Sequence, residues 1–234
     1  MSDSAAALSP TFRSRLAARV TLLTVSLAIS IGALLLFAWL AEETLSGQTR
    51  QFDTNVRATV LSLASPGLTR VMVNVSLLGS ALVLGAASAC AVVAFLVVGW
   101  PRAATWIGMA MLGALILDTL LKYAFRRPRP IPFFGIALPH TPSFPSGHAL
   151  SSFCFYGVLA ALLIGRVRSR MAAASILLAA ALLIAAIGFS RIYLGVHYPT
   201  DVVAGYLAAA VWVSGLTAAD RYRLRRGQRT TPIE

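Results

Sequence analysis

Long apolar runs, separated by short polar or basic segments, follow one another along most of the chain. Each is long enough to cross roughly 30 Å of hydrocarbon as a helix of about 20 residues. The runs cover residues 20–41, 78–98, 103–121, 148–165, 172–189 and 202–217. This pattern predicts an all-α polytopic membrane protein with about six transmembrane helices, in which residues 1–234 form a single domain. The first run is longer than the apolar core of a signal peptide and lacks a small-residue cleavage site after it, so we expect it to be a retained span.

A shorter amphipathic segment lies between the first two runs. Its apolar residues recur at helical spacing, and they are Phe52, Val56, Val60 and Leu63. Asp53 and Arg57 are expected to face elsewhere. The segment 50–64 is therefore predicted to be a short interfacial helix, which Pro66-Gly67 ends. Two roles fit it equally, either guiding a lipid toward a site or simply connecting two spans.

Composition supports the membrane class and limits the other classes. The chain is 58% hydrophobic and 12% charged, with a mean hydropathy of +0.77, which lies outside the range of ordinary soluble domains. Its net charge is +12, but the basic residues lie at the ends of spans, so we expect no nucleic-acid partner. Cys90 and Cys154 lie within apolar runs and are expected to be small buried hydrophobes rather than a disulfide or metal site.

The distribution of basic residues predicts the orientation. Arginines at residues 13–19, 102, 166–170 and 221–229 fall on one side of a six-span topology, which the positive-inside rule makes cytoplasmic. We therefore expect cytoplasmic tails at residues 1–19 and 219–234 in a bacterial inner membrane, with the oligomeric state left open. The basic residues on the opposite side break the rule, and an anionic ligand would explain why they are there.

The first cluster on that opposite side follows the third predicted span. It contains Lys122, Arg126, Arg127 and Arg129, cations that repel one another unless an anion lies between them. Lys122 is the only lysine in the chain, which favours a compact point charge at this position. Asp118, one helical turn earlier, is placed to pair with it. The plain alternative is a span end whose basic side chains extend to the interface.

The second cluster is the sequence Pro-Ser-Gly-His at residues 145–148, where a loop meets the fourth span. Ser146 is expected to be an N-cap, and Gly147 to leave room for a ligand near the free backbone amides. This is a pattern suited to phosphate, with His148 at its edge as a candidate proton donor. The alternative is an ordinary helix cap with an interfacial histidine.

The third cluster lies between the fifth and sixth spans. Ser190-Arg191 precedes His197, and Asp201 is expected in the first turn of the helix that Pro199 begins. A carboxylate beside an imidazole fixes its tautomer and frees the other nitrogen for attack. Arg191 offers a forked donor for phosphate oxygens. An interfacial salt bridge is the alternative, but the predicted topology places all three clusters on one membrane face.

These motifs resemble the type 2 phosphatidic acid phosphatase family, which shares its site with vanadium haloperoxidases and several acid phosphatases. The pattern is Lys, six residues and Arg-Pro, then Pro-Ser-Gly-His, then Ser-Arg, five residues, His, three residues and Asp. The chain matches it without departure at Lys122, Arg129, Pro130, Pro145, Ser146, Gly147, His148, Ser190, Arg191, His197 and Asp201.

The resemblance implies a role for each matched residue. It makes His197 the nucleophile that forms a phosphoenzyme, Asp201 the residue that orients it, and His148 the acid that protonates the leaving oxygen. It makes a second group the phosphate-binding residues. That group is Lys122, Arg129, Ser146, Gly147 and Arg191. It also implies that the reaction needs no metal or other cofactor.

The site's position at an interface favours a membrane lipid substrate. Candidates are phosphatidic acid, phosphatidylglycerol phosphate and undecaprenyl diphosphate, hydrolysed on the extracytoplasmic face. Arg126 and Arg127, which lie outside the motif, weakly favour a diphosphate because they are free to take a second phosphate. The alternatives are a phosphotransferase of the same family and an anion transporter, which is disfavoured because the spans hold few ionisable residues.

Overall fold

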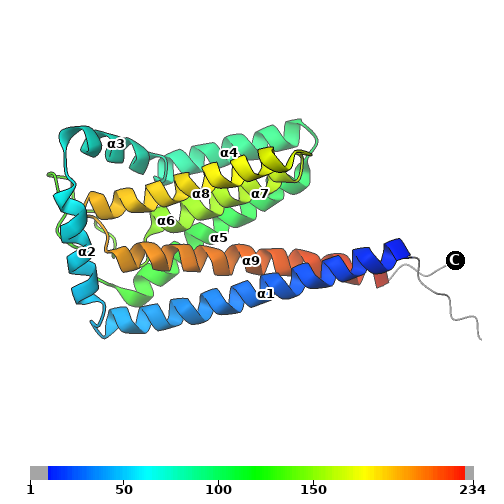
Figure 1. Ribbon diagram of the computed structural model, residues 1–234, viewed down its shortest axis with the longest axis horizontal. Coiled ribbons are helices and arrows are strands. Elements are labelled where there is room, and N and C mark those ends of the chain that lie inside the picture. Colours follow the sequence, from blue (N-terminus) through cyan, green and yellow to red (C-terminus); the bar gives the residue numbers. More distant parts are fainter. Residues whose placement is uncertain (1–9, 230–234) are drawn as a thin grey trace, which may run out of the picture.

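The computed structural model describes the backbone of residues 10–229, and the side chains of residue 21 and residues 24–222. This part of the chain contains only helices and connecting loops (Figure 1). The helices are α1 (Pro10–Leu45), α2 (Arg50–Ser62), α3 (Pro66–Leu77), α4 (Ala81–Val97), α5 (Pro101–Phe125), α6 (Gly147–Ser152), the π-helical turn η1 (Phe153–Gly157), α7 (Val158–Ile164), α8 (Arg170–Tyr193) and α9 (Pro199–Arg229).

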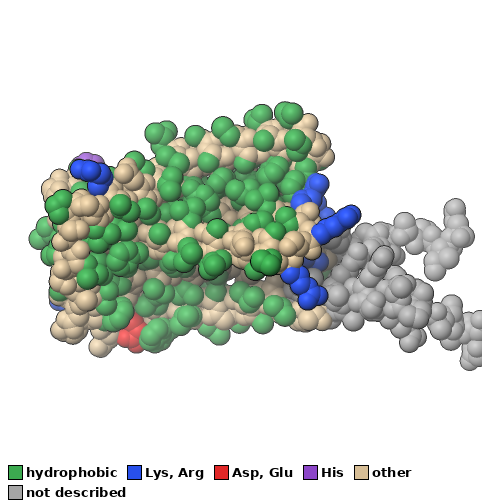
Figure 2. All heavy atoms as spheres, turned by 45° about the horizontal axis from the view of Figure 1, so that its top comes forward, with side chains coloured by type: hydrophobic (Ala, Val, Ile, Leu, Met, Phe, Trp, Pro, Cys, Tyr) green, Lys and Arg blue, Asp and Glu red, His purple; other side chains and the backbone are tan. Residues whose placement is uncertain are grey.

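The predicted all-α membrane fold is confirmed. Five helices are long and apolar enough to cross a membrane, and α3 with α4 makes a sixth if that pair, bent by 47°, is one broken span. The segments α6, η1 and α7 run on as one such span, Gly147–Ile164. Hydrophobic side chains cover the flank of the bundle in Figure 2, while basic side chains gather toward its ends.

Two boundaries differ from the sequence prediction. The expected tails are largely helical where the structure describes them, because α1 begins at Pro10 and α9 continues to Arg229. The second predicted span, residues 78–98, corresponds to α4 but begins three residues too early, because residues 78–80 form a turn between α3 and α4. Hydropathy misses this turn, since Leu78 and Leu77 continue the apolar run across it.

Short polar side chains and prolines set where several helices begin. Ser65, Ser80 and Ser169 each occupy an N-cap and accept a hydrogen bond from the backbone N–H three residues later, which satisfies a donor that the helix itself leaves free. Pro66 and Pro101 stand at the first helical position, where a missing N–H costs nothing.

The helices are arranged so that one end of the bundle collects the three sequence clusters. Helix α1 lies along α9, and α4 along α5 (Figure 1). The start of α1 and the end of α9 lie at one end of the bundle, whereas α5 and α8 end, and α9 begins, toward the other. The loop of residues 126–146 crosses that second end before the chain enters α6.

Helix α2 lies across this second end, roughly perpendicular to the long helices (Figure 1). A helix is confirmed here, but only half of the predicted apolar face packs inward, where Val60 is buried and Val56 is partly buried against it. Phe52 and Leu63 are exposed, whereas Asp53 is fully buried and Arg57 is half-buried. Polar partners explain the reversal, because Arg57 donates a hydrogen bond to the carbonyl oxygen of Ile131 at 2.8 Å and Asp53 has partners described below.

Candidate active site

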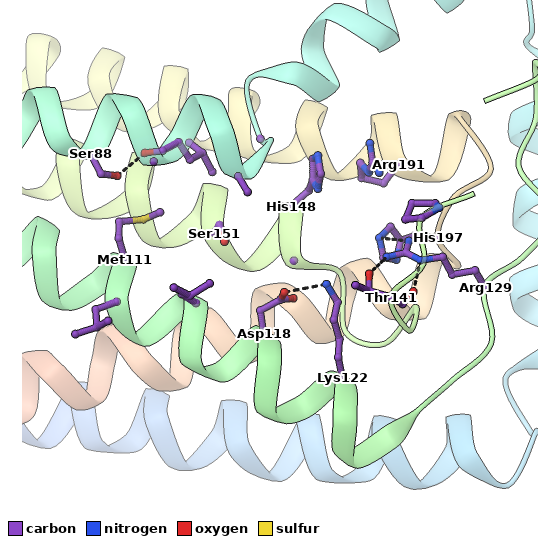
Figure 3. Close-up of a pocket in the computed structure, with 18 residues that line it drawn as sticks. Ser88, Met111, Asp118, Lys122, Arg129, Thr141, His148, Ser151, Arg191 and His197 are labelled. Atoms are coloured by element: carbon purple, nitrogen blue, oxygen red, sulfur yellow. Dashed lines mark hydrogen bonds and ion pairs between the residues drawn. The ribbon is translucent and has the colours of Figure 1, made fainter. Parts of the chain in front are cut away.

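A cavity of about 470 Å³ lies where the three sequence clusters meet. Its polar end is lined by residues from all three, together with the carboxylate of Asp118 (Figure 3). These residues are Lys122, Arg129, Gly147, His148, Arg191 and His197. Lys122 and His197, 75 positions apart in the chain, thus share one space, as the topology of the spans predicted. Asp201 and Ser146 lie behind this lining rather than on it.

His197 and Asp201 form a buried pair at the start of α9. Asp201 occupies the first turn of the helix that begins at Pro199, as expected. Its Oδ2 lies 3.3 Å from Nδ1 of His197, and both side chains are almost completely excluded from solvent. The carboxylate is held in place by two shorter hydrogen bonds to the same oxygen, from the hydroxyl of Ser143 at 2.5 Å and the amide of Tyr198 at 2.8 Å.

The tautomer of His197 follows from its two partners. Nε2 lies 2.9 Å from Nη1 of Arg129, and a guanidinium can only donate hydrogen bonds. Nε2 is therefore the unprotonated nitrogen, and the proton resides on Nδ1, where it points to Asp201. Burial lowers the pKa of His197 to about 4, with Asp201 opposing the shift and Arg129 and Arg191 adding to it. The ring is neutral at pH 7, with its lone pair at the cavity.

Arg129 is fixed by the loop that crosses the site. Its Nε donates to the carbonyl oxygen of Thr141 at 2.6 Å, and its Nη2 donates to the Thr141 hydroxyl at 3.0 Å. The same Nη1 that contacts His197 also donates to the carbonyl oxygen of Val196 at 2.9 Å. The guanidinium therefore donates a hydrogen bond to the unprotonated imidazole nitrogen, the one that can act as a nucleophile.

Lys122 is held at the cavity wall by Asp118, as the spacing on α5 predicted. Nζ of Lys122 lies 2.8 Å from Oδ2 of Asp118. The other carboxylate oxygen packs against Gly147, where an added Cβ would lie 2.5 Å from it. Gly147 is thus required for this close approach between α5 and α6, in addition to the ligand access that the sequence suggested.

Ser146 occupies the N-cap position of α6, as predicted, but its side chain makes no capping hydrogen bond. Its amide instead donates to the backbone oxygen of Asp201 at 2.8 Å. Its hydroxyl is buried and has no hydrogen-bond partner among the described residues. Gly205 of α9 permits this packing, since a Cβ there would lie 2.6 Å from the Ser146 carbonyl oxygen. Ser146 therefore joins α6 to α9 and keeps a free hydroxyl beside the site.

The break between α3 and α4 contacts two motif residues, His148 and Arg191. The hydroxyl of Ser76, near the end of α3, accepts a hydrogen bond from Nη1 of Arg191. Gly79 faces His148, whose Cδ2 would lie 3.2 Å from a Cβ at that position. Figure 3 shows His148 and Arg191 beside each other at one wall of the cavity. The turn that hydropathy missed therefore supports the site.

Arg126 and Arg127 do not line the cavity, contrary to the accessory role predicted for them. Arg126 ends α5 in a left-handed conformation with φ 47°, and its exposed side chain donates to the backbone oxygen of Tyr123. Arg127 turns the other way and pairs with Asp53 at 2.7 Å and Asp201 at 2.6 Å. Its guanidinium is already occupied by two buried carboxylates.

Several residues of this network were not identified from the sequence. They are Asp53, Ser76, Thr141 and Ser143. All are small polar residues outside the motifs, and the only signal for Asp53 was its place in the amphipathic segment 50–64. Their contacts depend on the path of loops, which residue spacing does not give.

The cavity continues from its polar end into an apolar arm between α4 and α5. One wall is a stripe on α4 at helical spacing, formed by Ala81, Leu84, Gly85 and Ser88. The facing wall is formed by Met111, Leu112 and Leu115 of α5. Leu112 and Leu115 are more than half exposed on the flank of the bundle. A single space therefore joins cationic groups to the lipid-facing surface.

Comparisons with known proteins agree with this architecture. A model described as the PAP2 superfamily matches residues 103–225. Phosphatidylglycerophosphatase B of Bacillus subtilis (strain 168) is 33% identical over 111 residues, 44% of this chain and 52% of the relative. Lipid A 1-phosphatase of Rhizobium etli is 36% identical over 127 residues, 49% of this chain and 50% of the relative. The chain thus spans about half the length of the curated relatives it matches.

Two crystal structures share the fold. A transmembrane PAP2-type phosphatidylglycerolphosphate phosphatase from Bacillus subtilis superposes with a TM-score of 0.74 and 24% identity, over 84% of this chain and 98% of that one. Aquifex aeolicus LpxE superposes with a TM-score of 0.53 and 26% identity, over 71% of this chain and 94% of that one. The chain therefore has a multi-pass membrane fold that is already known from crystal structures.

Proposed function

Since the chain belongs to the PAP2 superfamily, whose model matches more than half of it, we propose that it is a lipid phosphatase that works through a phosphohistidine at His197. The observation that carries this proposal is the continuity of the cavity, from three cationic side chains and two histidines to an apolar arm open between α4 and α5. A phosphate is a ligand for the first part, and an acyl chain is a ligand for the second.

The first chemical step is attack of His197 on phosphorus. Nε2 is unprotonated and faces the cavity, so it forms a P–N bond as the bond from phosphorus to the lipid oxygen breaks. Arg129, which contacts Nε2 in this structure at 2.9 Å, moves its hydrogen bond to a phosphate oxygen. Positive charge develops on the imidazole, and Asp201 stabilises it through the Nδ1 proton.

The remaining groups stabilise the transferring phosphoryl group and the leaving oxygen. Lys122, Arg129 and Arg191 lie around the cavity, where they can hold the equatorial oxygens once Arg129 has transferred its hydrogen bond from Nε2 of His197. His148 gives a proton to the departing lipid oxygen. It then takes one from a water that attacks phosphorus, so that the P–N bond breaks and orthophosphate leaves.

The network around Arg127 favours a monoester over a diphosphate as the substrate. The sequence suggested a second phosphate site at Arg126 and Arg127, but one of these is exposed outside the cavity and the other is paired with two carboxylates. Phosphatidylglycerol phosphate and lipid A 1-phosphate, the substrates that the relatives' names indicate, are the first candidates. Phosphatidic acid and undecaprenyl diphosphate follow.

The orientation is proposed from charge alone. Both ends of the described chain lie at the end of the bundle opposite the cavity (Figure 1), and the arginines near them favour the cytoplasmic side. The site would then face the extracytoplasmic side of the inner membrane and meet lipids of that leaflet. A cysteine-accessibility assay at Arg126, which is exposed beside the site, reports this directly in intact cells.

The test is phosphate release by the detergent-purified protein in EDTA. Phosphatidylglycerol phosphate, lipid A 1-phosphate, phosphatidic acid and undecaprenyl diphosphate are compared at equal concentration in mixed micelles. We expect release from at least one monoester, abolished by His197→Ala and retained in His140→Ala, since His140 is exposed and outside the cavity lining. Release that survives His197→Ala, or no release from any substrate, would overturn the proposal.

A further inference from the structure

The amphipathic helix α2 contributes a fully buried carboxylate to the far side of the site. Asp53 accepts three hydrogen bonds, two from Thr200 at the start of α9 and one from Arg127 in the loop that crosses the site. Thr200 donates its amide to Oδ1 at 3.1 Å and its hydroxyl to Oδ2 at 2.8 Å. Arg127 donates to the same Oδ2 at 2.7 Å. A charge buried in this way is costly unless it is compensated, so these contacts position α2 as well as Asp53.

Arg127 bridges the two carboxylates of this region. Its Nη1 lies 2.6 Å from Oδ1 of Asp201, and its Nη2 lies 2.7 Å from Oδ2 of Asp53. The hydroxyl of Thr200, between them, accepts a hydrogen bond from Nη1 at 2.9 Å. The ring of Tyr198 covers the guanidinium at 4.0 Å. The geometry is that of a fork with each prong on a different acid, which an ammonium cannot reproduce.

The two carboxylate oxygens of Asp201 have different hydrogen-bond partners. Oδ1 accepts a hydrogen bond from Arg127. Oδ2 faces His197 and also accepts hydrogen bonds from Ser143 and Tyr198. Because Oδ1 is anchored, the carboxylate cannot rotate about its terminal bond, and Oδ2 stays directed at Nδ1 of His197. Arg127 therefore contributes, together with Ser143 and Tyr198, to orienting the carboxylate that holds the imidazole of His197.

Asp53 also determines how far the positive charge of Arg127 neutralises the carboxylate of Asp201. With both acids present, one guanidinium contacts two carboxylates at nearly equal distances, so Asp53, Arg127 and Asp201 by themselves carry a net charge of about −1. Arg57, which lies over the ring of Tyr198, is a second cation that interacts electrostatically with both carboxylates. Without Asp53, Arg127 and Asp201 would form a neutral pair. An imidazolium developing at His197 would then lose its compensating charge, since the other ionised neighbours of that ring, Arg129 and Arg191, are cations.

We propose that Asp53 and Arg127 are positioning residues for Asp201, which make α2 part of the phosphoryl-transfer machinery although neither residue touches the cavity. This rests on the proposed function for its kinetic consequence. It also assigns a task to the segment 50–64, whose role the sequence left open between lipid guidance and connection.

The experiment compares Asp53→Asn and Arg127→Lys with Asp220→Asn and Arg102→Lys. The control pair carries the same substitutions in the Arg102–Asp220 ion pair, 2.5 Å long and distant from the cavity lining. For both test variants we expect kcat to fall about 10- to 100-fold with KM changed less than about threefold, as for residues that orient a reacting side chain. The controls should retain the kcat and KM of the unaltered protein.

A second readout separates positioning from mere stability and does not need turnover. The Nδ1 proton and the ¹⁵N shifts of His197, measured by NMR in micelles, report its hydrogen bond to Asp201. We expect both to change in Asp53→Asn and to be unchanged in Asp220→Asn. Thr200→Val, which removes the bridging hydroxyl while keeping the shape, gives the same comparison with a milder change if Asp53→Asn does not fold.

The two readouts fail in different ways. If the unaltered protein releases no phosphate but the His197 signals respond to Asp53→Asn, the proposed function fails and the positioning role stands. If Asp53→Asn and Arg127→Lys, or Thr200→Val in place of the first, leave both kcat and the His197 signals unchanged, the positioning role is wrong. A loss confined to KM would equally overturn it, because it would place these residues in substrate binding.

Discussion

The protonation of His197 gives the sharpest physical prediction, and lowering the pH from 7 to 5 is the perturbation that reveals it. Burial holds the pKa of this histidine near 4. At pH 5 a histidine of usual pKa, 6.5, would be only about 3% unprotonated, whereas one of pKa about 4 would be about 90% unprotonated. The sign follows from desolvation, which penalises the charged imidazolium, so the reactive neutral form persists further into acid.

The assay is an NMR titration of ¹⁵N-histidine-labelled protein in detergent micelles. The chain has three histidines, so His140→Gln and His148→Gln assign the spectrum by elimination. We expect the His197 resonances to stay those of a neutral ring down to about pH 5, with the proton on Nδ1 as the Arg129 contact requires. A midpoint above about 6, or a ring protonated on Nε2 at neutral pH, would refute the reasoning from burial and from the Arg129 contact.

Two further predictions concern the cavity walls. In Gly147→Ala the new Cβ would lie 2.5 Å from Oδ1 of Asp118, so this carboxylate must move and release Lys122. Loss of a buried charge contact should lower kcat/KM for phosphatidylglycerol phosphate about 5- to 150-fold. Gly108→Ala, with open space around it, is the matched control, and equal activities of the two variants would contradict the packing argument. His148→Ala should impair hydrolysis of a monoester more than that of a diphosphate in steady-state assays, because an alkoxide needs a proton to leave more than a phosphate does, and equal losses on both would show that His148 is not the acid.

The spans were predictable because apolar period and length report burial in lipid directly. The helix of residues 101–125 and that of 170–193 each enclose the predicted run. The turn at residues 78–80 was included in the second run because Leu77 and Leu78 before it and α4 after it are apolar, although Gly79 and the N-cap Ser80 mark the break. Helix ends in the tails were missed for a related reason, because a charged helix that continues past the membrane carries no apolar signal.

The site was predictable to the extent that its chemistry is local in sequence. Lys122 with Asp118, and His197 with Asp201, are pairs four residues apart on helical segments, and the structure places both pairs in contact. Arg127 was placed wrongly because its partners lie 74 residues away in either direction. Charge alone identified it as a cation in need of an anion, and only the fold shows that protein carboxylates take that place.

The most direct test of the mechanism is to trap the phosphoenzyme on His197. Purified protein is mixed with phosphatidylglycerol phosphate in EDTA, quenched in base within milliseconds, digested and analysed by mass spectrometry for an acid-labile phosphate on histidine. The account predicts phosphate on the peptide carrying His197 and none in His197→Ala. Phosphate on a different residue, or turnover of this substrate without any trapped intermediate, would contradict it.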